Sequence, residues 1–202
     1  MTQMKILQED STYTFRAYFE LPNDTDEVLA EFGYEFKNVR LQLPSTTRQI
    51  AGLPELQQQI EETLPFVPLT SETAKREILI APILSRVAVI CQQILRIEYP
   101  LKVNNLLQGN LDYLIRAGHS FVVVEAKRDD LTRGFTQLAV EMIALSMLED
   151  APDVLYGAVT IGNLWIFGIL DAATQTITQD IGSYTLPDDL EALVRILVGI
   201  LE

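Results

Sequence analysis

The sequence predicts an α/β fold built on a mixed β-sheet that is flanked by helices. Short apolar runs of strand length alternate with longer segments in which apolar residues repeat every three or four positions. These segments follow the order helix, three-stranded meander, helix and further strands, which is the pattern of an α/β three-layer core. With 202 residues, of which 48% are hydrophobic, the chain can bury a full core in such an arrangement.

The first part of the chain is expected to form an α+β extension packed on the core. Its predicted elements are a half-buried strand from Tyr13 to Leu21, a second strand from Tyr34 to Leu43 and a short helix from Pro54 to Leu64. Pro65 and Pro68 mark the best boundary. The sequence therefore divides into an extension over residues 1–65 and a main domain over residues 66–202.

The main domain is predicted to open with a long helix from Ser71 to Ile97, bent at Pro82 because proline removes one backbone donor. Strands are then expected at 101–106, 110–116, 120–127, 153–161 and 164–170, with Gly162-Asn163 joining the last pair and a closing helix from Pro187 to Leu201. Between the third and fourth strands, apolar residues at helical spacing predict a helix that Asp129 or Asp130 can cap.

The segment from residue 110 to 127 has the pattern of a β-hairpin, in which two apolar runs flank Arg-Ala-Gly-His-Ser. If Gly118 and His119 form a two-residue turn, Asp112 lies directly opposite Glu125, with Cβ atoms about 5 Å apart. Lys127 projects from the same face as Glu125 because strand side chains alternate with a period of two. The hairpin is thus predicted to bring two carboxylates and an ammonium group together.

Two carboxylates facing each other among apolar residues need a compensating cation. Lys127 is one candidate and a divalent metal is another. Ligands that are all oxygen suit Mg²⁺ or Mn²⁺, and the carbonyl of Ala126 would be a third ligand beside Asp112 and Glu125. In phosphodiester cleavage such a metal polarises the scissile phosphate, while Lys127 stabilises the charge that builds up on phosphorus.

Gln137 and Glu141 lie four residues apart in the otherwise apolar run from Phe135 to Leu148, so they share a helix face. Two interpretations stay open. The pair either contributes to the site formed by the hairpin or forms the solvated stripe of an amphipathic helix.

The ordered set of Asp112, Glu125-Ala-Lys127 and Gln137 resembles the PD-(D/E)xK nuclease superfamily, which has the restriction-endonuclease-like fold. The segments at 70–84 and 156–165 are similar to the first helix and the closing strands of the amino-terminal nuclease domain of type I restriction-enzyme motor subunits. In that group a helix-borne glutamate joins the site, and Glu72 is the matching position. The resemblance covers about residues 66 to 170.

This resemblance implies a magnesium-dependent endodeoxyribonuclease of restriction or repair type. It assigns metal ligation to Asp112 and Glu125, an outer ligand to Glu72, electrostatic catalysis to Lys127 and the orientation of that lysine to Gln137. The alternative is a catalytically inactive nuclease fold that serves as a binding or assembly module, since a fold does not fix a function.

Net charge argues against a polyanionic partner, because the chain carries −13 at pH 7. The balance is uneven, however: residues 66–133 carry nine basic and seven acidic side chains, whereas residues 134–202 carry one and ten. The cations expected to contact phosphate around the site are Lys75, Arg76, Arg116, Arg128 and Arg133. We therefore expect DNA as a weakly bound partner, with a homodimer or a protein partner as possible help.

No long uncharged apolar run or signal-peptide layout is seen, so a cytoplasmic location without a membrane partner is expected. Cys91 is the one cysteine and is interpreted as a buried core thiol. His119 is the one histidine and is expected at the hairpin tip, which excludes catalysis by a nucleophile–histidine pair.

Overall fold

A computed structural model describes residues 6–8, 11–117, 120–125 and 130–202, and for 120–125 it describes the backbone alone. The described chain is an α/β structure with a mixed sheet. The strands are β1 (Glu35–Val39), β2 (Leu95–Lys102), β3 (Gln108–Arg116), β4 (Ser120–Glu125), β5 (Val154–Thr160), β6 (Leu164–Asp171), β7 (Thr176–Asp180) and β8 (Tyr184–Thr185). Their order across the sheet is β1-β7-β6-β5-β4-β3-β2, with β8 paired to β6. The pairs β1–β7 and β4–β5 are parallel and the other pairs are antiparallel.

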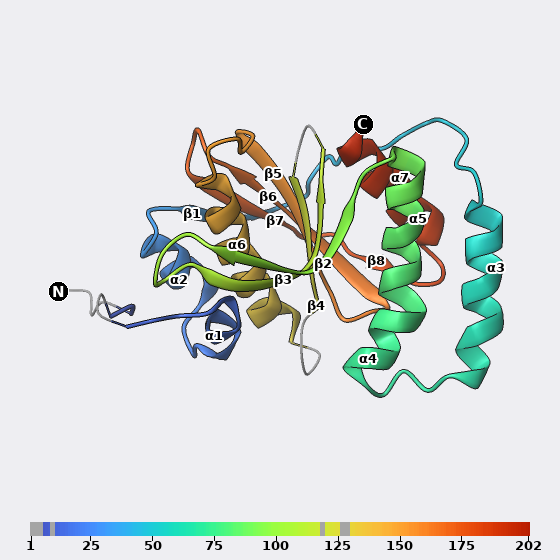
Figure 1. The fold of residues 1–202 in the computed structure, drawn as a ribbon, viewed down its shortest axis with the longest axis horizontal. Coiled ribbons are helices and arrows are strands. Elements are labelled where there is room, and N and C mark those ends of the chain that lie inside the picture. Colours follow the sequence, from blue (N-terminus) through green and yellow to red (C-terminus); the bar gives the residue numbers. More distant parts are fainter. Residues whose placement is uncertain (1–5, 9–10, 118–119, 126–129) are drawn as a thin grey trace.

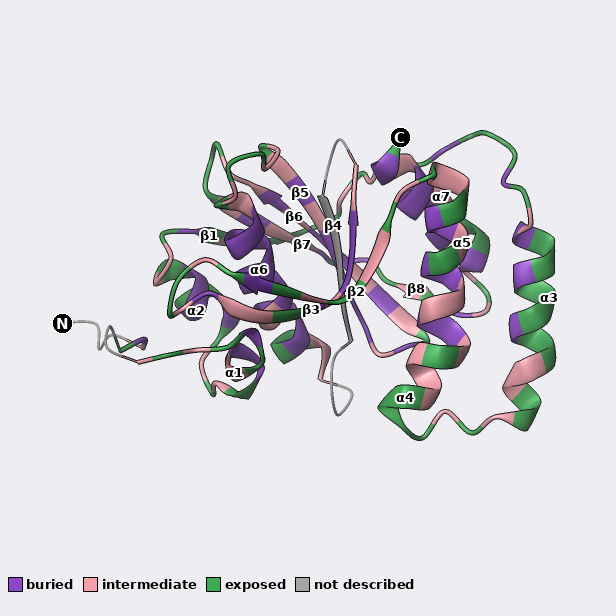
Figure 2. Ribbon diagram, in the orientation of Figure 1, coloured by how far each residue is buried: buried purple, intermediate pink, exposed green. Residues whose placement is uncertain are grey.

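Helices cover both faces of this sheet (Figure 1). The helices are α1 (Phe15–Glu20), α2 (Thr25–Ala30), α3 (Leu53–Thr63), α4 (Glu72–Lys75), α5 (Ala81–Cys91), α6 (Leu131–Ser146) and α7 (Leu190–Leu201), with a 3₁₀ turn at Leu64–Phe66 and a π-helical turn at Arg76–Ile80. One core lies under α1, α2 and α6, and the other lies under α3, α5 and α7. The helices of the two layers differ in burial: α6 is buried along most of its length, whereas α3 exposes its outer face (Figure 2).

Helix α6 begins where the sequence predicted. Asp130 is its N-cap, and one carboxylate oxygen of Asp130 accepts a hydrogen bond from the backbone nitrogen of Arg133 at 3.0 Å. This bond satisfies one of the amide groups that a helix start leaves without a partner. Of the two predicted caps, Asp130 is confirmed, and residue 129 lies outside the described residues.

The first 65 residues contribute to the sheet and to both cores. The predicted strand from Tyr13 to Leu21 is wrong, because residues 15–20 form α1, which buries Phe15, Tyr18 and Phe19 against α6. These positions fit helical spacing as well as alternation, so the pattern alone did not decide between them. The second predicted strand is confirmed as the shorter β1, and the short helix is confirmed as α3.

The helical run that begins at Glu72 is shorter than predicted. It ends at Cys91, because Gln92 adopts a left-handed conformation with φ of 55° and the chain enters β2. Pro82 stands at the start of α5, directly after the π-helical turn. The altered hydrogen-bond spacing of this turn accommodates the missing backbone N–H of proline. Cys91 is half-buried rather than buried, and burial raises the pKa of its thiol.

The first predicted strand, 101–106, is displaced: β2 spans Leu95–Lys102, and residues 103–107 form a bend. The later strands follow the prediction closely. The β3–β4 hairpin and the β5–β6 pair are confirmed, and Gly162 and Asn163 lie in the connection between β5 and β6. Trp165 at the start of β6 is fully buried in the core. Across the part of the chain that is described, none of the helices combines the length and apolar character needed to span a bilayer.

Candidate functional site

The side-chain alternation of β3 breaks at Asp112. Leu114 packs in the core under α6, and Tyr113 and Ile115 pack in the core on the other face. Regular alternation would place Leu111 with Tyr113, but Leu111 packs in the same core as Leu114. The strand backbone therefore rotates about its own axis within 111–113, and Asp112 lies at this irregularity, between the two helix layers.

The neighbouring strand is irregular at the same level. Ile97 pairs with Tyr113 and Tyr99 pairs with Leu111, while Glu98, between the two paired residues of β2, has a left-handed backbone with φ of 51°. Such a conformation is uncommon for a residue other than glycine. The interruption of pairing opens the sheet beside Asp112.

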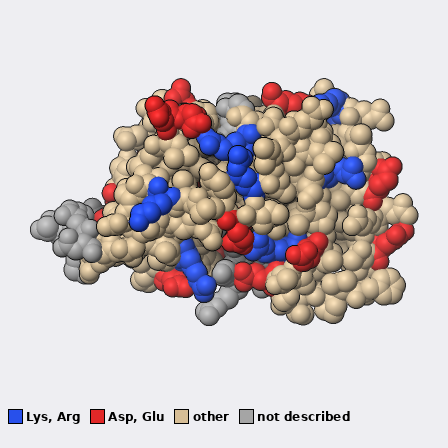
Figure 3. Space-filling view, in the orientation of Figure 1, with Lys and Arg blue, Asp and Glu red and all other residues tan. Residues whose placement is uncertain are grey.

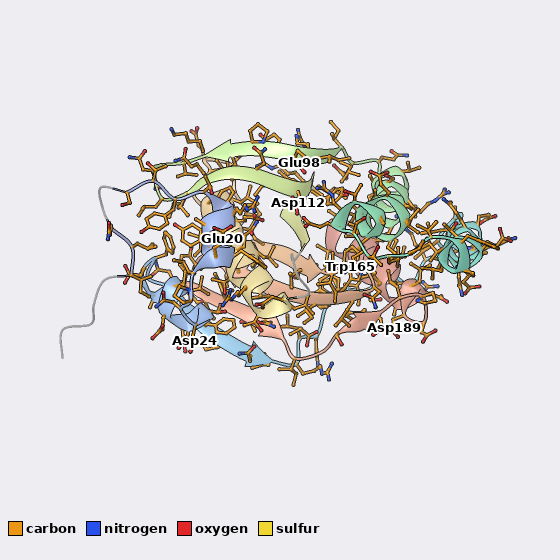
Figure 4. All side chains as sticks on the ribbon, turned by 90° about the horizontal axis from the view of Figure 1, so that it is seen from below. Glu20, Asp24, Glu98, Asp112, Trp165 and Asp189 are labelled. Carbon is orange, nitrogen blue, oxygen red and sulfur yellow. The ribbon has the colours of Figure 1, made fainter. Side chains whose placement is uncertain are left out.

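An open cavity of about 390 Å³ lies at this interruption. Its lining residues are Thr14, Arg16, Glu98, Gly109, Asn110, Asp112 and Gln137. Figure 4 shows Glu98 and Asp112 on adjacent strands. The cavity therefore lies between the β2–β3 pair and α6. Asp112 and Gln137 both line it, as the sequence predicted, and Thr14 and Arg16 of the amino-terminal segment line it as well.

Glu141 lies one helical turn beyond Gln137 and is fully buried, so the interpretation of this pair as a solvated stripe is wrong for Glu141. The amide nitrogen of Gln137 donates a hydrogen bond to one carboxylate oxygen of Glu141 at 2.9 Å. The other oxygen, Oε2, is buried and has no hydrogen-bond partner among the described residues. Burial raises the pKa of Glu141 well above its ordinary value, the bond from Gln137 lowers it, and the charge of Asp112 raises it further. Burial thus favours the protonated form of Glu141.

Arg76 brings a cation to the site from the opposite helix layer. Its Nε donates to the hydroxyl of Tyr113 at 3.3 Å, its guanidinium lies 5.1 Å from the centre of that ring, and its Nη1 donates to Glu98 at 2.9 Å. Burial lowers the pKa of Arg76, while its hydrogen bonds to Tyr113 and Glu98 and the charge of Asp112 raise it, and the pKa ends above its ordinary value. Arg76 is thus tied to the cavity through Glu98, which lines it together with Asp112.

Glu72 and Lys75 lie at the start of the same helical run. Ser71 caps α4 by accepting a hydrogen bond from the backbone nitrogen of Ala74 at 3.0 Å. Glu72 is exposed and stands one helical turn before Arg76, and Lys75 packs against the β5–β6 connection at Gly162. Both predicted residues thus belong to the helix whose Arg76 contacts Tyr113.

The predicted pairing of the hairpin is displaced by one residue. Tyr113 pairs with Val123 and Arg116 pairs with Ser120, so three residues, not two, connect the strands. Continued in this register, the strands would set Val124 opposite Asp112. The prediction that Asp112 and Glu125 are direct cross-strand partners is therefore wrong. Glu125 is the last residue of β4, and its backbone pairs with Thr160 of β5.

Several predicted site residues are not part of the description. Ala126, Lys127 and Arg128 lie outside the described residues, as does His119, and the side chain of Glu125 is likewise not described. Within the described ranges, three or more His, Cys, Asp or Glu side chains are nowhere grouped to hold a metal ion. Of the predicted metal ligands, Asp112 and the outer ligand Glu72 have side chains that are placed.

Two of the predicted DNA-contacting arginines are held by acidic residues. Arg116 is the last residue of β3, about 13 Å along the strand from Asp112, and donates to Asp150 at 3.0 Å. Arg133 forms an ion pair with Asp130 at 3.4 Å. Basic and acidic groups are interspersed over the middle of the face shown in Figure 3. Among the described cations, Arg16 lines the same cavity as Asp112, and Arg76 pairs with Glu98 of that cavity.

Sequence reasoning missed Glu98 and Arg16, which lack a motif of their own. The one available signal was for Glu141, a lone acid within an apolar helix. A scan against protein-family models and a search of curated proteins gave no match to this chain.

Proposed function

We propose that this chain is a metal-dependent nuclease that hydrolyses DNA phosphodiester bonds and that its fold is of the restriction-endonuclease-like type. The observation that carries the proposal is the cavity at the β2–β3 interruption, which holds Asp112 and Gln137 together. Glu125 ends β4, the strand next to β3, and in the proposal its side chain and Lys127 complete the site that Asp112 and Gln137 begin.

The donor chemistry of the cavity fits a hard divalent cation. Its lining offers carboxylate and amide oxygens and includes neither sulfur nor imidazole. In the proposal Asp112 and Glu125 hold Mg²⁺ or Mn²⁺, with the Ala126 carbonyl as a further ligand and Glu72 as an outer one. Bound there, the metal would polarise the scissile phosphate and lower the pKa of a water molecule.

Protein side chains supply the remaining catalytic and substrate-binding groups. The Lys127 ammonium stabilises charge that develops on the phosphate in the transition state. The amide nitrogen of Gln137 is held by Glu141, which leaves its carbonyl oxygen to orient a donor such as Lys127. Arg76, partly buried and always charged, binds a phosphate oxygen of the substrate.

A second function, binding or assembly without cleavage, is supported by the net charge of −13 and by the ion pairs that hold Arg116 and Arg133. A cleavage assay on single-stranded, duplex and branched DNA with Mn²⁺ or Mg²⁺ distinguishes the two. The nuclease proposal expects metal-dependent products that Asp112→Asn abolishes. Asp26→Asn on α2 is the matched control, because it makes the same change at an exposed position. Inertness of the wild-type protein on every substrate would favour the binding module.

A further inference from the structure

The ion pair of Arg76 and Glu98 links the site's partly buried cation to a carboxylate that solvent can reach. The side chain of Arg76 is 23% exposed, whereas that of Glu98 is 50% exposed. Tyr113 holds the guanidinium through both a hydrogen bond and its ring face. Arg76 is therefore fixed by the buried Tyr113, while its contact to Glu98 is one that an incoming ligand can replace.

Glu98 reaches Arg76 from a strained backbone. Its φ of 51° lies in the left-handed region, and it sits where the pairing of β2 with β3 is interrupted. Strained residues persist where the surrounding structure imposes them, and they cluster at ligand-binding sites. The strain at Glu98 thus coincides with the cavity that Glu98 shares with Asp112.

A carboxylate and a phosphate present similar pairs of oxygen atoms to a guanidinium. The Nη1–Oε1 distance of 2.9 Å is that of a charge-assisted hydrogen bond. Glu98 therefore occupies the position at which a phosphate oxygen would meet Arg76, within the lining of the proposed catalytic cavity.

We propose that Glu98 is an internal substitute for phosphate on Arg76, and that nucleic-acid phosphate binds by displacing it. The inference rests on the proposed function in taking DNA as the source of the phosphate. Glu98 then makes Arg76 selective against small free anions, because such an anion competes poorly with a carboxylate that the chain already holds beside the guanidinium. A polynucleotide that also contacts the rest of the cavity displaces it more readily.

The test is equilibrium binding of short fluorescent single-stranded and duplex DNA at low salt, without divalent metal so that cleavage does not enter. Glu98→Gln should lower the Kd about threefold to tenfold, because it removes the competing charge from Arg76. Glu20→Gln is the matched control. Glu20 pairs with Arg16 on the cavity wall at 3.3 Å, but both side chains are about two-thirds exposed, so the same loss of charge should have a smaller effect.

A double-variant cycle separates displacement from general electrostatics. In an Arg76→Gln background, Glu98→Gln should give no more gain than Glu20→Gln. Glu98→Gly removes the carboxylate and also relieves the backbone strain, so it should reproduce the gain if Glu98→Gln folds poorly. Equal gains in the two glutamate variants, a gain that persists without Arg76, or an absence of DNA binding by all proteins would overturn the inference. Since cleavage is not measured, failure of the nuclease proposal alone leaves a positive result intact.

Discussion

Replacing Glu141 by methionine should stabilise the protein. The Glu141 side chain is fully buried, and no residue in the described part of the chain hydrogen-bonds to its Oε2. An unsatisfied buried polar group costs about 1–3 kcal/mol, and methionine has similar length and a flexible apolar end that fits the same space. The half-buried amide of Gln137, which loses its acceptor, can turn toward the cavity. We therefore expect the free energy of unfolding to rise by about 1–3 kcal/mol, or about 2–4 °C in Tm for each kcal/mol.

Urea denaturation and thermal melting measure this effect, and α3 supplies a matched control. Gln58 donates to Glu62 at 2.7 Å with the same four-residue spacing, but this pair is exposed. Glu62→Met should change stability by no more than about 0.5 kcal/mol. If Glu141→Met lost more than about 1 kcal/mol while Glu62→Met stayed neutral, Glu141 would be making a favourable interaction, and its description as an uncompensated buried acid would be refuted.

Three further predictions concern pH, packing and metal binding. Because the folded-state pKa of Glu141 is raised, its contribution to stability is present below the unfolded pKa of about 4.3 and is lost as pH rises toward the folded pKa. The stability advantage of Glu141→Gln over wild type in urea titrations should therefore grow from about pH 5 upward, and a pH-independent difference would contradict the raised pKa. Gly199→Ala should destabilise α7 by about 1–3 kcal/mol although alanine favours helices, because its Cβ would lie 2.8 Å from the backbone of Ser45; stabilisation in thermal melts would refute this contact. Asp112→Asn should abolish the Mn²⁺ binding seen in calorimetry, whereas Asp26→Asn should not, and equal affinities would reject Asp112 as a ligand.

The sequence predicted those parts of the fold in which local and tertiary preferences agree. The β3–β4 hairpin, the Asp130 cap and the turn at Gly162 each combine a turn or cap residue with flanking apolar runs. Where an apolar pattern fits both helical and strand spacing, it did not decide between helix and strand, as residues 15–20 show. The short β7 also escaped prediction, because its sequence Thr-Ile-Thr-Gln-Asp offers a single large apolar residue.

The candidate site was predictable in its chain order but not in its geometry. The register of β3 on β4 depends on whether two or three residues make the turn, and a shift of one residue changes every cross-strand partner. The role of Glu98 depends on a left-handed backbone and on its distance from Arg76, neither of which leaves a sequence motif. Glu141 was visible as an anomaly, but its burial comes from the packing of α6.

The central claim, a catalytic nuclease site at Asp112, Glu125 and Lys127, is tested most directly by Mn²⁺-dependent DNA cleavage with Lys127→Ala. Lys37→Ala on β1 is the control, because Lys37 is an exposed lysine at the opposite edge of the sheet, paired with Glu35. We expect wild type and Lys37→Ala to cut at least one DNA form at low salt. Lys127→Ala should bind DNA normally but lose most of the cleavage, because the lysine charge acts in the transition state. Equal cleavage by Lys127→Ala and wild type, or inertness of all three proteins on single-stranded, duplex and branched DNA, would contradict it.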